Sequence, residues 1–305
     1  MSKFTRRQFI MKTSGAAAFS ILASQSIAEL PIGSGTITTV SDGHLVLPLD
    51  FAIGSAPPQQ AKTLLRNYGI IGNEVRPNCN VSIYRDGTNT VLFDVGSGPD
   101  FMPSAGRLLD NLASVGVSPD DVTHVLFTHA HPDHIWGLLD EFDEPIFVNA
   151  AHMIGAKEWD YWWDPETVNT IGEQRMVFAV GARRRLELME DMFDRFTDGD
   201  EVVSGISAVA THGHTPGHMS FEVRSGSQAS LIIGDAIVNH HLAFERPEWP
   251  SGSDQNPSQG IETRNALFDR ILADNLSVAG FHFPGSGMGA VERASTGYRF
   301  LEDQV

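Results

Sequence analysis

The segment FTHAHPDHIWG, residues 127–137, places three histidines and one aspartate within six consecutive positions. The residues just before it form an apolar, β-branched run that is typical of a buried strand. Side chains at i and i+2 of extended backbone point the same way, so His129 and His131 can share one ion, whereas Asp133 and His134 can reach a second. Imidazole and carboxylate are ligands of zinc, manganese, iron or cobalt. The segment therefore predicts a metal site, the alternative being a chance cluster on a solvated loop.

Three further strand-like runs also end in histidine or aspartate. THGHTPGH offers three candidates, His212, His214 and His218. LIIGDA ends in Asp235, whose carboxylate would be costly to bury without a partner, and GFHFPG contains His282. Taken singly, Asp235 or His282 would be an ordinary capping or surface residue. Four strand ends that each carry such a side chain predict one shared site.

The rest of the chain alternates between strand and helix patterns, which is typical of an α/β domain. Two of the predicted strands flank Asp86-Gly87 and indicate a hairpin, and the Pro-, Gly- and Ser-rich residues 247–260 predict a surface loop. We expect a single domain over residues 29–305 with a helical insertion near 151–196. The predicted strands are 36–40, 45–49, 80–84, 90–94, 122–128, 145–150, 206–211, 220–225, 230–235 and 276–281, and the predicted helices outside the insertion are 104–115 and 261–275.

Residues 1–28 have the features of an export signal. Arg6 and Arg7 precede a short apolar run, and Ser26 and Ala28 form a small-residue cleavage pattern. The run is too short to span a bilayer. The segment resembles a twin-arginine signal, which exports folded proteins, so we expect a periplasmic or secreted protein. The alternative is a chance basic N-terminus on a cytoplasmic protein.

The composition and net charge of the chain limit the classes of binding partner that we expect. The 305 residues contain 21 Lys and Arg against 38 Asp and Glu, a net charge of -17. Nucleic acids and anionic membranes would be repelled, so neither is an expected partner. Cys79 is the single cysteine, which excludes an intramolecular disulfide and a Cys-rich metal cage. For Cys79 itself we expect a small thiol that is buried or half-buried.

Together, HAHPDH, GHTPGH, the GD pair and the C-terminal histidine resemble the metallo-β-lactamase superfamily over nearly the whole chain after residue 28. SDGHLVLPLD, FHFPGSG and GYRF are most similar to its methyl parathion hydrolase branch. The resemblance implies an α/β fold, the four-layered αβ/βα sandwich, with the site at the sheet edges. It also assigns the ligands: one ion would be held by His129, His131 and His214, the other by Asp133, His134 and His282, and Asp235 would bridge them.

The same resemblance suggests residues around the ions. LFDVG is similar to a family strand that would place Asp94 behind the metal loop as an orienting carboxylate, although a strand-end turn former is an equal alternative. Phe101 and Trp159 match aromatic positions that line the leaving-group pocket of the methyl parathion hydrolase branch. For Trp159 the alternative is packing between helix and sheet. His240 and His241 face either the pocket or water. With His214 assigned as the ligand, His212 and His218 are expected to support the loop rather than to bind an ion.

The family's chemistry implies an exported hydrolase with two divalent ions per chain. Zn²⁺ is the expected metal, with Mn²⁺, Fe²⁺ and Co²⁺ as alternatives. A metal-bridging hydroxide would attack an ester-type bond of a small-molecule substrate: an organophosphate triester, a carboxyl ester or a lactone. Asp133 and Asp235 are the predicted catalytic residues, and no serine or cysteine nucleophile is required. Family members dimerise, which implies a homodimer, although the sequence identifies no interface.

Several alternatives follow from the same residues. Zinc β-lactamases of the cysteine-containing class carry Cys where Asp235 stands, and glyoxalase II-like thioesterases add a C-terminal helical domain for which this chain has too few residues. Superfamily nucleases need a basic surface that an acidic chain lacks. N-acyl-homoserine lactonases usually have Tyr three positions after the bridging Asp, where this chain has Val238. A lactonase and a non-catalytic periplasmic metal-binding protein both remain as alternative functions.

Overall fold

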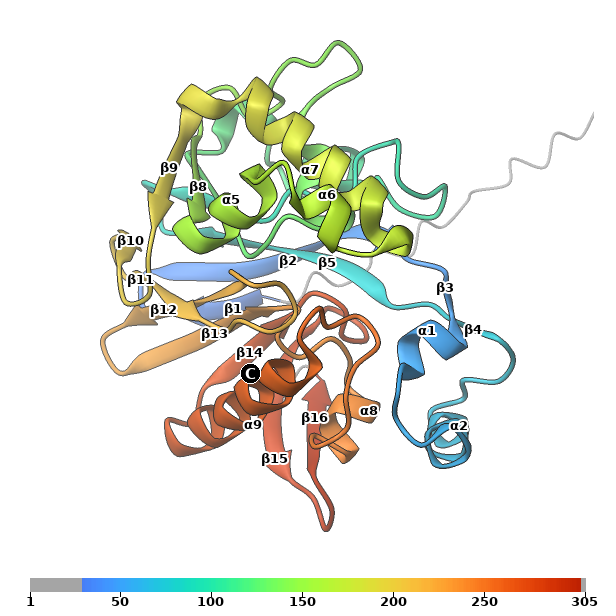
Figure 1. The fold of residues 1–305 in the computed structure, drawn as a ribbon. Coiled ribbons are helices and arrows are strands. Elements are labelled where there is room, and N and C mark those ends of the chain that lie inside the picture. Colours follow the sequence, from blue (N-terminus) through green and yellow to red (C-terminus); the bar gives the residue numbers. More distant parts are fainter. Residues whose placement is uncertain (1–28, 303–305) are drawn as a thin grey trace, which may run out of the picture.

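The computed structural model describes residues 29–302, in which two seven-stranded sheets pack face to face (Figure 1). The predicted export signal at 1–28 lies outside the described residues. The first sheet has the order β1-β2-β5-β6-β7-β8-β9, with parallel pairing from β6 to β9. Its strands are β1 (Glu29–Ile32), β2 (Gly35–His44), β5 (Asn78–Arg85), β6 (Thr90–Phe93), β7 (His124–Phe127), β8 (Ala151–Gly155) and β9 (Phe193–Phe196).

The second sheet follows the chain order from β10 to β16, and only β13 and β14 pair in parallel. Its strands are β10 (Glu201–Val203), β11 (Ile206–Ala210), β12 (Met219–Ser225), β13 (Gln228–Gly234), β14 (Ser277–Gly280), β15 (Met288–Arg293) and β16 (Tyr298–Glu302). A separate small ribbon pairs β3 (Leu47–Pro48) with β4 (Glu74–Val75).

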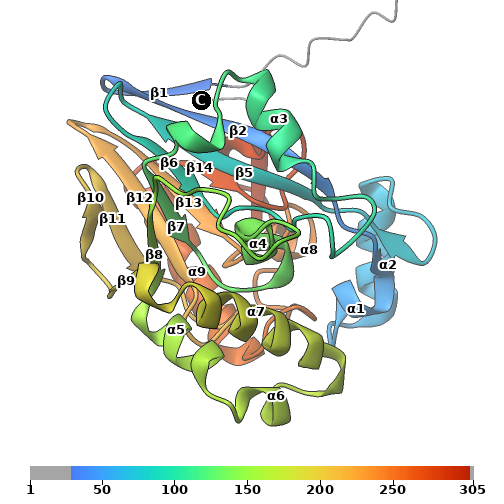
Figure 2. The ribbon, with the colours of Figure 1, turned by 90° about the horizontal axis from the view of Figure 1, so that it is seen from above.

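Helices cover the outer face of each sheet (Figure 1). Figure 2 shows α3, α5 and α7 on the side of the first sheet, where buried Leu112, Trp162 and Leu186 join one apolar cluster. On the other side α9 packs against the second sheet through residues such as Phe268. The helices are α1 (Leu49–Ile53), α2 (Pro58–Asn67), α3 (Leu108–Ser114), α4 (Pro132–Ile135), α5 (Ala156–Trp163), α6 (Thr167–Thr170), α7 (Met176–Leu188), α8 (Leu242–Glu245) and α9 (Pro257–Ala273).

These layers confirm the predicted four-layered αβ/βα sandwich. A third apolar cluster fills the space between the sheets, with Ile37 and Phe93 from one sheet and Phe221 and Ile232 from the other. Alternating side chains of each strand therefore serve two cores, one between the sheets and one beneath the helices. Within the described residues no helix combines the length and apolar character needed to cross a membrane.

Local sequence explains several boundaries. The Asp86 carboxylate accepts hydrogen bonds from the backbone N–H groups of Thr88 (2.9 Å) and Asn89 (2.7 Å), which closes the predicted hairpin between β5 and β6. Helix α9 starts with a proline in its first turn, and the Asn256 side chain accepts from Gln259 N at 3.2 Å. The predicted loop at 247–260 therefore ends in the first turn of α9.

Two predicted strands are wrong. In the 45–49 segment only Leu47 and Pro48 pair, and Leu49 already belongs to α1, where it is buried in a separate apolar cluster. The 145–150 segment forms turns around the buried Phe147, and the strand β8 begins only after it. A short apolar run indicates that a segment is buried, but it does not distinguish a strand from a buried loop or helix.

The segment predicted as a helical insertion begins and ends within the first sheet. β8 pairs in parallel with both β7 and β9, and α5, α6 and α7 connect β8 to β9. Such a connection is the crossover that parallel neighbours require. The helices near 151–196 are therefore a continuation of the sandwich layers.

Candidate metal centre

The loops that follow β6, β7, β11, β13 and β14 meet at one place. The β7 loop turns sharply because Pro132 occupies the first position of the short helix α4, where a missing N–H has no cost. This turn brings Asp133 and His134 inward, and their side chains are buried. Backbone N–H groups of His134 and Ile135 bond to the His131 carbonyl and hold the turn. All seven sequence-predicted ligands lie in this cluster, at 0–8% exposure: His129, His131, Asp133, His134, His214, Asp235 and His282.

Three imidazole nitrogens converge on one side of the cluster. His131 Nδ1 lies 3.0 Å from His129 Nε2 and 2.9 Å from His214 Nε2. The three nitrogens are close enough together to hold one metal ion. Burial, followed by the neighbouring histidines, lowers the pKa of His129 and His131 well below its usual range. Both rings are therefore neutral, which is the form that binds a cation.

Asp133, His134 and His282 form the other side. Asp133 Oδ2 lies 3.2 Å from His282 Nε2 and 3.4 Å from His134 Nε2. Asp235 stands between the two groups, because its Oδ2 is 3.3 Å from both His214 Nε2 and His282 Nε2 and its Oδ1 is 3.5 Å from His134 Nε2. This central position is what the predicted bridging role requires.

Unpartnered buried atoms test whether metal ions fit these residues. Asp133 Oδ2, His134 Nε2 and Asp235 Oδ1 are buried without a hydrogen-bond partner among the described residues. Each such atom would cost about 1–3 kcal/mol. Burial opposes ionisation of Asp235, but His282, His134 and His214 outweigh it and lower the pKa of Asp235 well below the ordinary value. Divalent cations would satisfy all three atoms, so the residues fit a metal centre.

Side chains behind the ligands fix their orientation. Asp94, at the end of β6, has a positive φ of 68° that turns its carboxylate under the metal loop. Its Oδ2 lies 2.8 Å from His134 Nδ1, and its Oδ1 accepts from Thr128 N at 2.8 Å. His282 Nδ1 donates to the Asn78 carbonyl at 2.6 Å. Each contact leaves the Nε2 lone pair of its histidine directed at the centre.

Two buried carboxylates near the ligands were not predicted. Asp254 Oδ1 lies 3.3 Å from His214 Nδ1, although its segment was predicted to be a surface loop. Glu158 accepts four hydrogen bonds: from Ala130 N (2.9 Å), Trp162 Nε1 (2.5 Å), Thr215 Oγ1 (2.6 Å) and Gly217 N (3.1 Å). Burial raises the pKa of Glu158, and these donors oppose that rise. Glu158 thus joins the β7 loop to the β11 loop.

Sequence contained a weak indication of Glu158 and none of Asp254. A carboxylate among the tryptophans of EWDYWW needs buried partners if the segment is a core helix. His218 was predicted to support the loop rather than to bind an ion. Its Nε2 accepts a hydrogen bond from Asp235 N at 2.9 Å. Nothing in a Pro- and Ser-rich run distinguishes Asp254 from an exposed loop residue.

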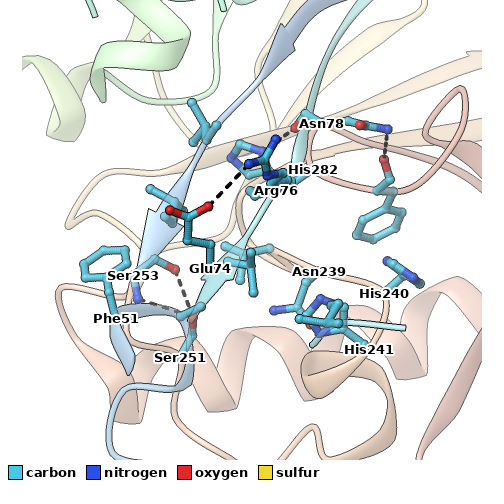
Figure 3. Close-up of a pocket in the computed structure, with 18 of the residues that line it drawn as sticks. Phe51, Glu74, Arg76, Asn78, Asn239, His240, His241, Ser251, Ser253 and His282 are labelled. Carbon is cyan, nitrogen blue, oxygen red and sulfur yellow. Dashed lines mark hydrogen bonds and ion pairs between the residues drawn. The ribbon is translucent and has the colours of Figure 1, made fainter. Parts of the chain in front are cut away.

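A cavity of about 820 Å³ opens in front of the centre, and five of the predicted ligands line it. Figure 3 shows His282 and Asn78 on one side of it and Asn239, His240 and His241 on another. The walls combine aromatic and aliphatic side chains with a few charged ones. They include Phe51, Tyr68, Phe101, Arg175, Phe178 and Val238.

The two aromatic residues predicted for the pocket differ in placement. Phe101 lies in the cavity wall against Phe178, with ring centroids 6.1 Å apart. Trp159 is only 1% exposed and does not line the cavity. Its ring stacks on Trp163 at 5.1 Å, and Arg195 covers it. The pocket prediction for Trp159 is therefore wrong, because α5 directs this side chain toward β9 and the core.

Comparison with known proteins agrees with this geometry. A sequence profile described as the metallo-beta-lactamase superfamily matches residues 75–278. The chain belongs to this superfamily. The uncharacterised protein Mb2612c of Mycobacterium bovis is 29% identical over 224 residues, covering 71% of this chain and 90% of that protein. The N-acyl homoserine lactonase AttM of Agrobacterium fabrum is 29% identical over 128 residues, covering 41% of this chain and 44% of AttM.

Solved structures extend the likeness to the whole sandwich. The hydrolase AbOPH of the beta lactamase superfamily is 26% identical, with a TM-score of 0.82 over 90% of this chain and 96% of that one. AidC, described as a dizinc quorum-quenching lactonase, shares the fold with a TM-score of 0.85 over the same coverage at 20% identity. This metallo-β-lactamase superfamily chain is thus similar in fold to a hydrolase of the same superfamily and to a dizinc lactonase.

Proposed function

We propose that this chain is a dinuclear metal-dependent hydrolase that cleaves ester-type bonds of small neutral molecules. The observation that carries the proposal is the convergence of seven buried histidine and aspartate side chains, which contribute to overlapping groups of possible ligand atoms within 4.8 Å of one another, with three of their atoms unpartnered. The cavity in front of the ligands supports a substrate of modest size with apolar groups. Among ester-type bonds we include carboxyl esters, lactones and organophosphate triesters.

The residues of the centre would have distinct roles in binding the ions and in orienting the attacking water. His129, His131 and His214 would hold one ion, Asp133, His134 and His282 the other, and Asp235 would touch both. Bound divalent cations would supply a nucleophilic water at neutral pH and polarise the C=O or P=O oxygen of the substrate. The Asp133 and Asp235 carboxylates border the cavity, where they can accept hydrogen bonds from the attacking water and fix its direction.

The cavity walls would bind the remainder of the substrate. Phe101 and Phe178 form an aromatic wall beside His131, whose ring is 5.7 Å from that of Phe178. Flat apolar groups pack well against such a wall. This feature, together with Val238 in the cavity, supports an aryl or alkyl ester of the kind expected for the methyl parathion hydrolase branch.

An N-acyl-homoserine lactonase is the second candidate, and the similarity to AttM favours it. Val238 in the cavity argues for the first candidate, since lactonases of this family usually have tyrosine there. We also propose export through the 1–28 segment and zinc as the metal, on the sequence features and the donor set given above.

A substrate panel tests the proposal. Metal-loaded protein is assayed with p-nitrophenyl esters, methyl parathion or paraoxon, and N-acyl-homoserine lactones. We expect turnover of at least one class, and loss of both metal and turnover in His129→Ala and Asp235→Ala. Absence of turnover on the whole panel by protein that carries two ions per chain would favour the non-catalytic metal-binding alternative. Full activity in either variant would contradict the site.

A further inference from the structure

The sulfur of Cys79 lies at the metal centre. Cys79 is on β5, next to Asn78, whose carbonyl accepts from His282. The Cys79 Sγ, a carboxylate oxygen of Asp133 and a ring nitrogen of His282 all lie within 4.8 Å of one another. Three atoms of these types at such spacing can ligate one ion, since metal–sulfur bonds measure about 2.3 Å and metal–nitrogen bonds about 2.0 Å.

The pleat of β5 directs the sulfur toward the ligands. The side chains on either side of it, Asn78 and Asn80, both donate to the Phe283 carbonyl, at 3.2 Å and 3.0 Å. Since successive side chains of a strand point to opposite faces, Cys79 points away from Phe283. There it belongs to the cluster that includes Ala130 and Ile135, residues of the metal loop.

A second observation points to a ligand at the same place. Asp133 Oδ2 is buried, has no hydrogen-bond partner among the described residues, and lies 3.2 Å from His282 Nε2. Asp133 is 6% exposed, so solvent offers little compensation for that oxygen. The Cys79 thiol already has a hydrogen-bond partner in the His282 ring. A cation between Asp133, His282 and Cys79 would satisfy the Asp133 oxygen and replace this thiol contact by a sulfur–metal bond.

We propose that Cys79 Sγ is an additional ligand of the ion held by Asp133 and His282, which gives that ion mixed sulfur, nitrogen and oxygen donors. The inference rests on the metal centre of the proposed function. Forming the sulfur–metal bond releases the S–H proton to solvent, so the ligand set gains one negative charge. Thiolate favours zinc or cobalt over manganese or magnesium, and so this position selects a softer ion.

The sulfur approaches the ion from behind the cavity. Cys79 is fully buried and is not among the residues that line the cavity, whereas Asp133 and His282 are. A substrate in the cavity therefore does not reach the sulfur. Cys79 differs in this respect from a nucleophile, and its position on β5 differs from that of the Asp235 ligand after β13. The expected effect of Cys79 is on metal affinity and metal choice.

Cobalt substitution of the whole protein tests the proposal. The wild-type chain is loaded anaerobically with Co²⁺, and we expect a near-ultraviolet sulfur-to-cobalt charge-transfer band that Cys79→Ser and Cys79→Ala lack. X-ray absorption of the zinc form should show a sulfur neighbour at about 2.3 Å in the wild type alone. Because Cys79 is the single cysteine, loss of the band on substitution assigns the sulfur without ambiguity. We also expect Cys79→Ser to bind one of its two ions at least about tenfold more weakly in chelator competition.

Val81→Ala is the matched control, because Val81 is a fully buried neighbour of Cys79 in the same cluster and on the same face of β5. It should lose some stability and keep the band and both ions. Two bound cobalt ions without a charge-transfer band would overturn the role of Cys79 and leave the proposed metal centre intact. Failure of the wild type to bind cobalt or zinc at all would overturn both.

Discussion

Glu158 offers the sharpest test of how the two ligand loops are held together. In Glu158→Gln the amide oxygen can keep the Ala130 N–H and Trp162 Nε1–H, and the amide NH₂ group then faces Thr215 and Gly217. The Thr215 hydroxyl can rotate to accept a hydrogen bond from this NH₂ group. The buried Gly217 N–H, which in the wild type lies 3.1 Å from Glu158 Oε2, loses its acceptor. One unsatisfied buried donor and the loss of charge-assisted hydrogen bonds give a cost of about 2–3 kcal/mol.

The assay is urea unfolding of the metal-loaded variant, followed by tryptophan fluorescence and paired with the rate of metal loss to a chelator. We expect the free energy of unfolding to fall by about 2–3 kcal/mol. The metal affinity should fall about 10- to 100-fold, since both histidine loops lose a shared anchor. Glu187→Gln is the control, because Glu187 is an exposed carboxylate with one ion pair to Arg183, and its change should stay within about 0.5 kcal/mol. Glu158→Gln that unfolds and releases metal like the wild type would refute the reasoning.

Three more predictions address acid stability, His214 and the pocket. His152 is buried, and burial lowers its pKa from 6.5 to about 4; the unfolded chain therefore takes up the proton first, and stability falls as the pH drops through this window. From those two values His152 accounts for about 2 kcal/mol lost between pH 8 and pH 5, so urea unfolding of His152→Leu should show a correspondingly smaller loss, and an unchanged pH dependence would contradict this role. Asp254→Ala removes the carboxylate beside His214 Nδ1 and should weaken binding of one ion about 10- to 100-fold in chelator competition, whereas a wild-type affinity would show that Asp254 does not orient the ring. Phe101→Ala should raise KM for aryl esters by roughly tenfold with a smaller change in kcat, and an equal effect on small alkyl esters would argue against an aromatic contact.

The convergence of the seven predicted ligands could be predicted from sequence because each of them lies in a loop that follows a strand. HAHPDH contributes four ligands in one turn, and the carboxyl ends of β13 and β14, which pair in parallel, place Asp235 and His282 at the same edge. Asp94 was suggested by the resemblance alone, with a strand-end turn former as an equal alternative, and the structure places its carboxylate 2.8 Å from His134 Nδ1. In all these cases, local pattern and sheet geometry determine the position together.

Asp254 and Glu158 could not be predicted as supporting residues, because their partners are distant in sequence. Asp254 reaches His214 across 40 positions, and Glu158 reaches Thr215 across 57. Cys79 was expected to be a buried or half-buried thiol, and it is fully buried. Only the folded sheet places its sulfur beside Asp133. The error at Trp159 has a related cause, because a resemblance gives a position in a helix but not the direction of its side chain.

Metal content measured together with activity tests the central claim most directly. The purified protein is analysed for elements, assayed on its best substrate from the panel, stripped with a chelator, assayed again and reloaded with Zn²⁺. We predict about two divalent ions per chain, loss of activity on stripping, and recovery on reloading. Activity that is unchanged after every ion has been removed would contradict the account.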